Sequence, residues 1–440
     1  MTGSVEQVQI EKALKVQEAL PEQGLFAEKE WRVSPEPFLL SKSEAKQLER
    51  LGPLLFRFQK ACDVIYRRSR KGTLPHWIAD YLDRGKPSSL LDLASHPTWV
   101  DAVPRVIRPD LILTEEGFIA TELDSVPGGI GLTAWLGETY QRQNPGVRIL
   151  GGPQGMKEGF GSLFGGQGAD ILVSEESSDY RPEMDWLSHG LDGSWSVQSA
   201  ETYEVSGRDV YRFFELFDLP NLEGAWAAGE AAIQGDIELT SPLKPWLEEK
   251  MWSALFYSHP LKGVWERELR SGNQARLKSL FPQSWVVDPV EAPHFAVIPG
   301  LDIQSFHEMK DFSQSERELV LKLSGFNERA WGSRSVTIGQ DSSAQEWSTA
   351  VDEAIQGFSD SPYVLQRFHS GRIVSHPWFN KETGEIENLE GRVRLCPYYF
   401  VIPPSNQVIL GGVLATICPS DKKILHGMSD AILVPCAVES

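Results

Sequence analysis

The sequence predicts a mixed α/β protein (α/β or α+β) with a helical N-terminal region. Up to about residue 100, apolar and charged residues mix at near-helical spacing. From residue 105 onward, short apolar runs bounded by turn residues alternate with helical segments. The chain has 440 residues, of which 41% are hydrophobic and 23% charged, which is enough for two or three domains with their own cores.

The first hundred residues contain helix signals and one clear break. Residues 44–58 have helical spacing but are interrupted near Gly52-Pro53, and Ser88-Ser89 could open a further short helix.

A hairpin and a helix follow. Pro109–Leu113 and Gly117–Leu123 are expected to be strands joined by the turn 114–117. A helix is expected from about Thr133 to Arg142, closed by Asn144-Pro-Gly. Residues 147–240 then alternate strand-like runs, such as 147–150 and 171–173, with helical or glycine-rich ones, and residues 246–265 look helical.

Residues 318–368 give the most regular order. The pattern predicts a strand (318–323), a polar loop with two glycines (324–334), a strand (335–339), a helix (345–358) and a strand (363–368). The C-terminal part supplies strands at 372–376, 392–402 and 407–417, with a hairpin turn at 380–384.

We therefore expect four segments along the chain. They are a helical region (1–100), a hairpin segment (101–150), an α/β region (151–290), and a strand-rich C-terminal segment (291–440).

Charge and cysteine content limit the function. The net charge of −19 argues against a nucleic-acid partner; it suits a cationic substrate, although solubility alone explains it more simply. The four cysteines have no zinc-site spacing and indicate reduced thiols. With neither a signal-peptide core nor the roughly 20 apolar residues of a membrane span, the cytoplasm is the expected location.

Several common catalytic motifs are absent: there is no Walker A sequence, GxSxG elbow, HExxH or kinase HRD/DFG pair. The glycines between 151 and 166 do not fit a dinucleotide fingerprint and indicate a turn-rich segment instead.

The first candidate cluster lies on the predicted hairpin. Glu122 and Asp124 are two apart on a strand, so they should share a face, with Asp110 beside them on the neighbouring strand. Gathered carboxylates suit Mg²⁺ that also holds nucleotide phosphates, and Arg108 could meet a terminal phosphate. On spacing alone, an acidic surface hairpin is the favoured interpretation.

The second candidate is Lys322 with the loop that follows it. A lysine emerging from a strand can reach nucleotide phosphates, and a loop containing Gly325 and Gly332 can close over them with backbone N–H groups. A solvated lysine on an exposed hairpin is the alternative. The third candidate is the strand 363–368, whose end could present backbone groups to an adenine edge or could be ordinary core.

The order of these features resembles the circularly permuted ATP-grasp ligases, which include glutathionylspermidine synthase and eukaryotic-type glutathione synthetase. Arg108-Pro-Asp110 and Glu122-Leu-Asp124, followed by Pro127-Gly-Gly129, resemble the family's R-x-D and E-x-N segment. Lys250 and Lys322 resemble its ATP-contacting lysines, and residues 366–369 fall at its adenine hinge. The resemblance covers roughly residues 100–440. It implies a metal-binding hairpin and part of the ATP-grasp core in 101–150, a substrate-binding region in 151–290, and the ATP-grasp lid with the C-terminal core in 291–440.

The resemblance implies a ligase that uses ATP and Mg²⁺ to join a small-molecule or peptide carboxylate to an amine through an acyl-phosphate. The implied site residues are, for the metal, Asp110, Glu122 and Asp124, with Glu328 as a further candidate; for the reaction, Arg108 and Arg394; and for ATP, Lys250, Lys322, Gly325, Gly332, Gln366 and Phe368. Without the family, Lys250 reads as a solvated helix lysine and Arg394 as an exposed strand residue.

Two departures from the family stand out. Asp124 replaces the usual Asn and adds negative charge, and no amidase-length segment precedes the ligase part. Two alternatives stay open: a non-catalytic nucleotide or peptide binder, and a phosphotransferase that stops at the phosphorylated product.

Overall fold

The computed structural model describes residues 2–22, 24–25, 30–330, 334–427 and 429–439. By its internal contacts the chain forms two compact units, unit 1 (1–56, 97–242 and 370–440) and unit 2 (57–96 and 243–369). These bounds cut across three of the four segments expected from the sequence, because each unit is assembled from pieces that are distant along the chain. Sequence patterns follow chain order and do not reveal such interleaving.

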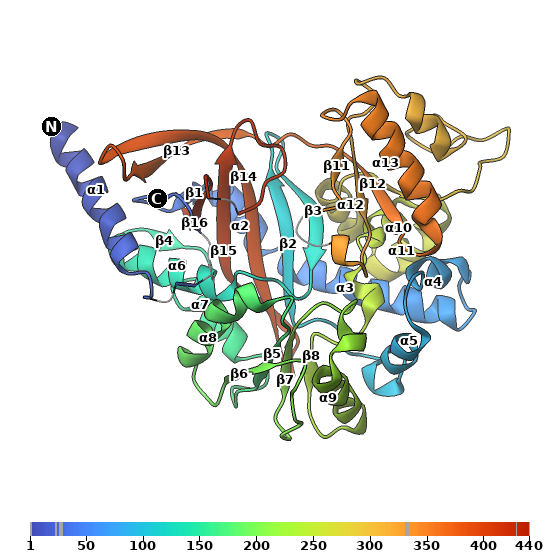
Figure 1. The fold of residues 1–440 in the computed structure, drawn as a ribbon, viewed down its shortest axis with the longest axis horizontal. Helices are drawn as coiled ribbons and strands as arrows, with labels where there is room; N and C mark the ends of the chain where they lie inside the picture. Colours follow the sequence, from blue (N-terminus) through green and yellow to red (C-terminus); the bar gives the residue numbers. More distant parts are fainter. Residues whose placement is uncertain (1, 23, 26–29, 331–333, 428, 440) are drawn as a thin grey trace. The chain divides into compact units, whose positions relative to one another are not determined.

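Unit 1 is built on a large, mostly antiparallel sheet (Figure 1). Its main path runs β1 (Phe38–Leu40), β16 (Ile432–Val438), β15 (Gln407–Pro419), β14 (Glu385–Ile402), β2 (Val106–Leu113) and β3 (Phe118–Asp124). Two further strands extend it: β13 (Ile373–Asn380) pairs with β14, and β4 (Arg148–Ile149) pairs with β16. Only β1 and β16 are paired in parallel in this sheet, as far as the described residues show.

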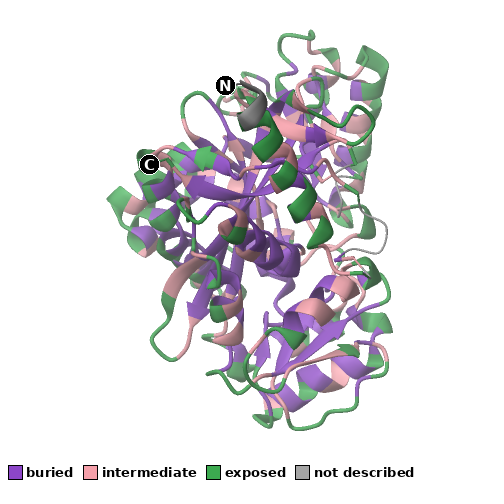
Figure 2. Cartoon of the chain, turned by 90° about the vertical axis from the view of Figure 1, so that its left-hand side faces the viewer, coloured by how far each residue is buried: buried purple, intermediate pink, exposed green. Residues whose placement is uncertain are grey.

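Helices α6 (Ile130–Gln143) and α7 (Gly155–Gly161) pack against this sheet. The approach of α7 depends on glycines, because a Cβ at Gly159 would lie 2.2 Å from the Phe400 ring of β14, and one at Gly411 of β15 would lie 2.3 Å from it. Most strand residues of the sheet are buried, and so are most residues of α6 (Figure 2).

A second, parallel sheet completes unit 1. Its order is β6 (Ser196–Ser199), β5 (Asp170–Val173), β7 (Val210–Phe213) and β8 (Leu239–Thr240). Every residue of β5 and β7 is buried, as expected for the inner strands of a parallel sheet. Helix α8 (Arg181–His189) contacts β6, and α9 (Glu223–Gln234) contacts β8.

Unit 2 contains a four-stranded antiparallel sheet in the order β11 (Thr337–Ile338), β10 (Leu319–Leu323), β12 (Tyr363–Arg367) and β9 (Ser284–Val287). Helix α13 (Ala344–Gln356) buries Trp347 and Val351 in one core with Leu319, Leu321 and Leu323. Because side chains alternate along a strand, Lys322 points away from this core. Helix α10 (Met251–Tyr257) contacts β9 and β12. The other helices of this unit are α4 (Trp77–Leu82), α5 (Ser88–Ala94), α11 (Lys262–Leu269) and α12 (Ser271–Leu280).

The predicted elements agree with the structure over most of the chain. The first hundred residues contain α1 (Thr2–Glu18), α2 (Lys42–Glu49) and α3 (Gly52–Arg70), with the break near Gly52 where it was expected. The exceptions are strands β1, β9 and β16 and helix α12, which the sequence did not predict. The four cysteines are buried free thiols.

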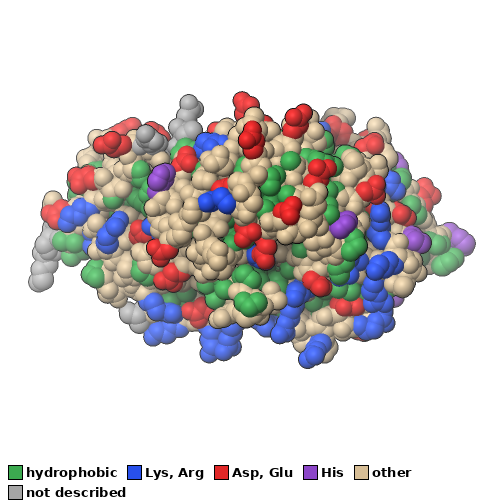
Figure 3. All heavy atoms as spheres, turned by 90° about the horizontal axis from the view of Figure 1, so that it is seen from below, with side chains coloured by type: hydrophobic (Ala, Val, Ile, Leu, Met, Phe, Trp, Pro, Cys, Tyr) green, Lys and Arg blue, Asp and Glu red, His purple; other side chains and the backbone are tan. Residues whose placement is uncertain are grey.

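Within the residues that the structure describes, no helix is long and apolar enough to cross a membrane. Acidic and basic side chains both occur across the face shown in Figure 3, so the net negative charge is not gathered there into one patch.

Candidate functional site

The β2–β3 hairpin of unit 1 brings the predicted acidic residues to one face. Arg108 lies opposite Asp124 across the hairpin, and Asp110 lies opposite Glu122. Directly paired residues of antiparallel strands point to the same side of the sheet. The expectation that Glu122 and Asp124 share a face with Asp110 is therefore met.

Two arginines bind these carboxylates in an ion-pair chain, defined here as Asp124, Arg108, Asp110 and Arg394. Arg108 Nη2 lies 3.0 Å from Asp124 Oδ2 and 3.1 Å from Asp110 Oδ1. Arg394 Nη1, on β14, lies 3.1 Å from Asp110 Oδ2. The Nε atoms of both arginines are buried and have no hydrogen-bond partner among the described residues.

Burial and the neighbouring charges determine the protonation of the residues in the ion-pair chain. Burial by itself lowers the pKa of Arg108, but the carboxylates of Asp110 and Asp124 outweigh it and raise that pKa well above its usual value. Burial raises the pKa of Asp124, and Arg108 opposes the rise. The Cys396 thiol donates to Asp110 at 3.4 Å, and burial raises its pKa to about 11, so it stays protonated at neutral pH.

The glycine segment after β3 is closely packed. Tyr398 Oη donates to the Gly128 carbonyl at 2.7 Å. The buried carboxylate of Glu183 accepts from the backbone N–H groups of Gly129 (2.7 Å) and Leu132 (3.1 Å) at the start of α6. A carboxylate therefore already occupies this helix N-terminus, where an anion would otherwise be favoured.

The hairpin carries the side-chain chemistry of a magnesium site. Its three carboxylates are the oxygen donors that Mg²⁺ prefers, yet Asp110 and Asp124 are bound to arginines. In the described part of the chain, no group of three or more His, Cys, Asp or Glu is placed to hold a metal ion. A cation could bind at this face only if Asp124 released Arg108.

In unit 2, the structure brings together the two lysines predicted to contact ATP. Lys322 lies on β10, two residues before Ser324, and is only 6% exposed. The backbone N–H of Lys250 donates to the Ser324 carbonyl at 2.9 Å. Lys250 Nζ donates to the Ala330 carbonyl, further along the same loop, at 3.3 Å. Both lysines thus lie at the base of the predicted phosphate-covering loop.

A buried ion pair holds the start of this loop. Lys86 and Glu249 form a salt bridge whose side chains are 1% and 2% exposed. Ser324 Oγ donates to the same Glu249 carboxylate and accepts from the Met251 N–H at 2.9 Å. Gly325 lies close by: a Cβ there would be 3.1 Å from Glu249 Cδ, a tight contact. Sequence analysis missed Lys86 and Glu249; their only signal was Glu249's position next to Lys250.

The remaining predicted residues of unit 2 are placed as follows. Gln366 is buried on β12, and its Nε2 donates to Ser253 Oγ at 3.1 Å. The Phe368 N–H donates to the Glu318 carbonyl at 3.0 Å, so this amide is already used within the protein. Glu328 begins a short 3₁₀ turn (Glu328–Ala330). Gly332 lies outside the described residues.

These sheets and helices define a glutathione-synthetase-like fold. A solved glutathione synthetase-like effector from Globodera pallida, in its apo form, superposes with a TM-score of 0.58 over 99% of this chain and 98% of that chain, at 9% identity. At that identity the likeness shows the fold alone.

A second solved structure, described as a γ-glutamylcysteine synthetase from Methylobacillus flagellatus, gives a TM-score of 0.36 at 11% identity, covering 89% of this chain and 87% of that chain. No family model matches the sequence, and no curated protein matches it.

Proposed function

We propose that the protein is an ATP-dependent carboxylate–amine ligase that forms an amide or peptide bond and releases ADP and phosphate. The observation that carries the proposal is the backbone hydrogen bond from Lys250 to Ser324, which brings Lys250 to the strand end that carries Lys322. The two lysines are far apart in the sequence, and the family resemblance assigns both of them to the ATP phosphates. The glutathione-synthetase-like fold supports a ligase activity.

In the proposed reaction, an oxygen of the substrate carboxylate attacks the terminal phosphorus of ATP, and the bond from that phosphorus to the bridging oxygen breaks, releasing ADP. The amine then attacks the acyl carbon. Phosphate leaves with the former carboxylate oxygen, and the amine loses its proton. Catalysis of this kind depends on positioning and charge rather than on covalent groups of the protein.

The chain's own residues are assigned to this reaction by charge. Lys250 and Lys322 would contact the phosphates, with Gly325 and Gly332 in the covering loop and Gln366 and Phe368 near the adenine. Arg108 would stabilise the transferred phosphoryl group, and Arg394 an anionic group of the substrate. Mg²⁺ is proposed to accompany ATP, with Asp110, Glu122 and Asp124 as its candidate ligands.

The test is a phosphate-release screen of carboxylates (amino acids and small peptides) paired with amines (amino acids and polyamines), followed by isotope labelling of the pair that reacts. If the carboxylate carries ¹⁸O, one labelled oxygen should enter phosphate for each amide formed, and the nucleotide product should be ADP. Release of AMP and pyrophosphate would mean adenylation and would overturn the assignment. Labelled phosphate that stays attached to the carboxylate whether or not an amine is present would indicate a phosphotransferase.

A second candidate function is nucleotide or peptide binding without catalysis. The ion-pair chain favours it, because Arg108 and Arg394 neutralise the carboxylates that a metal would need. This candidate predicts saturable ATP binding by calorimetry, with no ADP formed under any carboxylate and amine pair that the screen supplies.

A further inference from the structure

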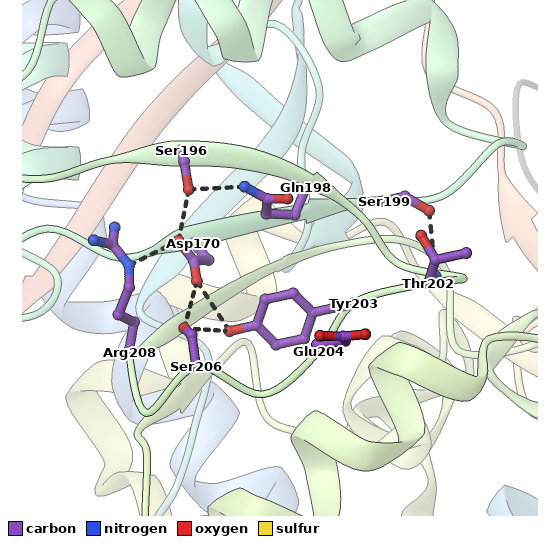
Figure 4. Close-up of a pocket in the computed structure, with 9 residues that line it drawn as sticks. All are labelled: Asp170, Ser196, Gln198, Ser199, Thr202, Tyr203, Glu204, Ser206 and Arg208. Atoms are coloured by element: carbon purple, nitrogen blue, oxygen red, sulfur yellow. Dashed lines mark hydrogen bonds and ion pairs between the residues drawn. The ribbon is translucent and has the colours of Figure 1, made fainter.

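A pocket of about 450 Å³ lies beside the parallel sheet of unit 1 (Figure 4). It is formed by β6, by the first residue of β5 and by the loop between β6 and β7. The lining residues are Asp170, Ser196, Gln198, Ser199, Thr202, Tyr203, Glu204, Ser206 and Arg208. None of them belongs to the predicted ligase site.

The buried Asp170 carboxylate organises one wall of the pocket. Its Oδ1 accepts from Ser196 Oγ (2.6 Å) and Arg208 Nε (2.8 Å), and its Oδ2 accepts from Tyr203 Oη (3.0 Å) and Ser206 Oγ (3.1 Å). A carboxylate has about four lone-pair sites, so these four donors occupy the acceptor sites of Asp170. Each of the three hydroxyl groups has then used its single hydrogen, and its oxygen can only accept.

Further donors of the lining are used as well. Ser199 Oγ donates to Glu201 at 2.7 Å. Because the hydroxyl of Ser196 has given its hydrogen to Asp170, its oxygen accepts from Gln198 Nε2 at 3.2 Å. This bond leaves the amide oxygen of Gln198 as a further acceptor. The guanidinium of Arg208 donates from its remaining two nitrogens to Ser194.

The pocket therefore presents acceptors, and its charge is negative. The lining holds two carboxylates, Asp170 and the exposed Glu204, against one arginine. Burial is the main cause that raises the pKa of Tyr203, which keeps its hydroxyl protonated and donating to Asp170. A ligand that matches this wall must bring hydrogen-bond donors and positive charge.

We propose that this pocket binds a small organic cation, an ammonium or guanidinium compound, at a site separate from the predicted ligase site. A metal ion fits less well, since the described residues hold no group of three or more His, Cys, Asp or Glu placed for one. The proposal rests on the pocket alone and stands whether or not the chain is a ligase.

The experiment is a calorimetric titration of the full chain with 1,4-diaminobutane and, separately, with 1,4-butanediol. The diol has the same length and no charge. We expect saturable binding of the diamine, weakened by added salt, and none of the diol. Glu204→Gln should weaken diamine binding about twofold to fivefold, the range for one exposed ion pair.

Glu158→Gln is the matched control, because Glu158 is an exposed carboxylate on α7 that does not line the pocket. It should leave diamine binding unchanged. Equal binding of diol and diamine, no diamine binding at all, or unchanged affinity in Glu204→Gln would overturn the proposal. Circular dichroism of each variant excludes loss of fold as the cause.

Discussion

Glu122 lies opposite Asp110 on the β2–β3 hairpin, on the face that carries the ion-pair chain. If this face holds the magnesium of a ligase, Glu122→Ala should lower Mg²⁺-dependent ATP turnover at least about 100-fold. The fold should persist, because Glu122 is only half-buried. The measurement is ADP release with the reacting substrate pair.

Glu116→Ala, in the exposed turn of the same hairpin, is the control and should turn over ATP normally. A folded Glu122→Ala protein with full activity would remove Glu122 from the site.

His376 on β13 makes stability depend on pH. Burial lowers its pKa from 6.5 to about 4, and Nε2 lies 3.1 Å from Ser34 Oγ. Since the folded pKa is below the unfolded one, the neutral ring stabilises the fold fully above pH 6.5. This contribution is lost as pH falls from about 6.5 to about 4, where the unfolded chain binds the proton and the folded protein does not. The loss should reach about 3 kcal/mol in the free energy of unfolding.

Urea unfolding at pH 7 and pH 4.5 measures this contribution. In the His376→Gln protein the difference between the two pH values should shrink. His189→Gln, at an exposed position on α8, should leave the difference between the two pH values as it is in the parent protein. An identical pH dependence in the parent and His376→Gln proteins would rule out this role.

Individual site residues were predictable where local geometry fixes them. Alternation along a strand placed Glu122 and Asp124 on one face with Asp110. Pairing with Arg108 was not foreseen, and Arg394 comes from a strand far along the chain. Which cation neutralises a carboxylate depends on tertiary packing, and no spacing rule contains that information.

At the scale of elements, the loop that starts at Ser324 is fixed at its base by the Lys86–Glu249 pair. Lys86→Met should lower the free energy of unfolding by about 3 kcal/mol, because it leaves a buried carboxylate without its counter-ion. Urea unfolding provides the measurement. Lys71→Met, at an exposed lysine of the same unit, should change little.

Adding Glu249→Gln to Lys86→Met should recover part of the loss, since Gln is neutral and can still accept from Ser324. A double variant as unstable as Lys86→Met would show that the buried charge is not the cause.

Elements were predictable where their own pattern is strong. The strand, loop, strand, helix and strand of residues 319–367 were found within a few residues of their positions, since each has a clear period and turn residues around it. β1 has three residues and stands between helical segments, so its sequence pattern is too short to predict a strand. It is a strand because β16 offers it a partner.

At the scale of the whole molecule, β16 lies between β1 and β15 in the large sheet. Deleting residues 431–440 should therefore disrupt unit 1. It removes buried residues such as Ile432 and Val434, leaves β1 and β4 without their partner strand, and opens one edge of β15. Hydrogen exchange should show lost protection in β15, while β10 in unit 2 should keep more of its protection.

The comparison protein ends at Val438 and so retains β16. It should keep its protection from hydrogen exchange in both β15 and β10. Native protection of β15 in the shorter protein would contradict this account.

The position of β16 also affects how the chain folds during synthesis. All of unit 2 has been translated once residue 369 has left the ribosome, whereas the sheet of unit 1 cannot close until residue 438 has emerged. Until residue 438 has emerged, β1 and β15 have unpaired edges, which favour pairing with other chains. We expect the nascent protein to depend on chaperones over this window and premature stop codons near its end to yield aggregates.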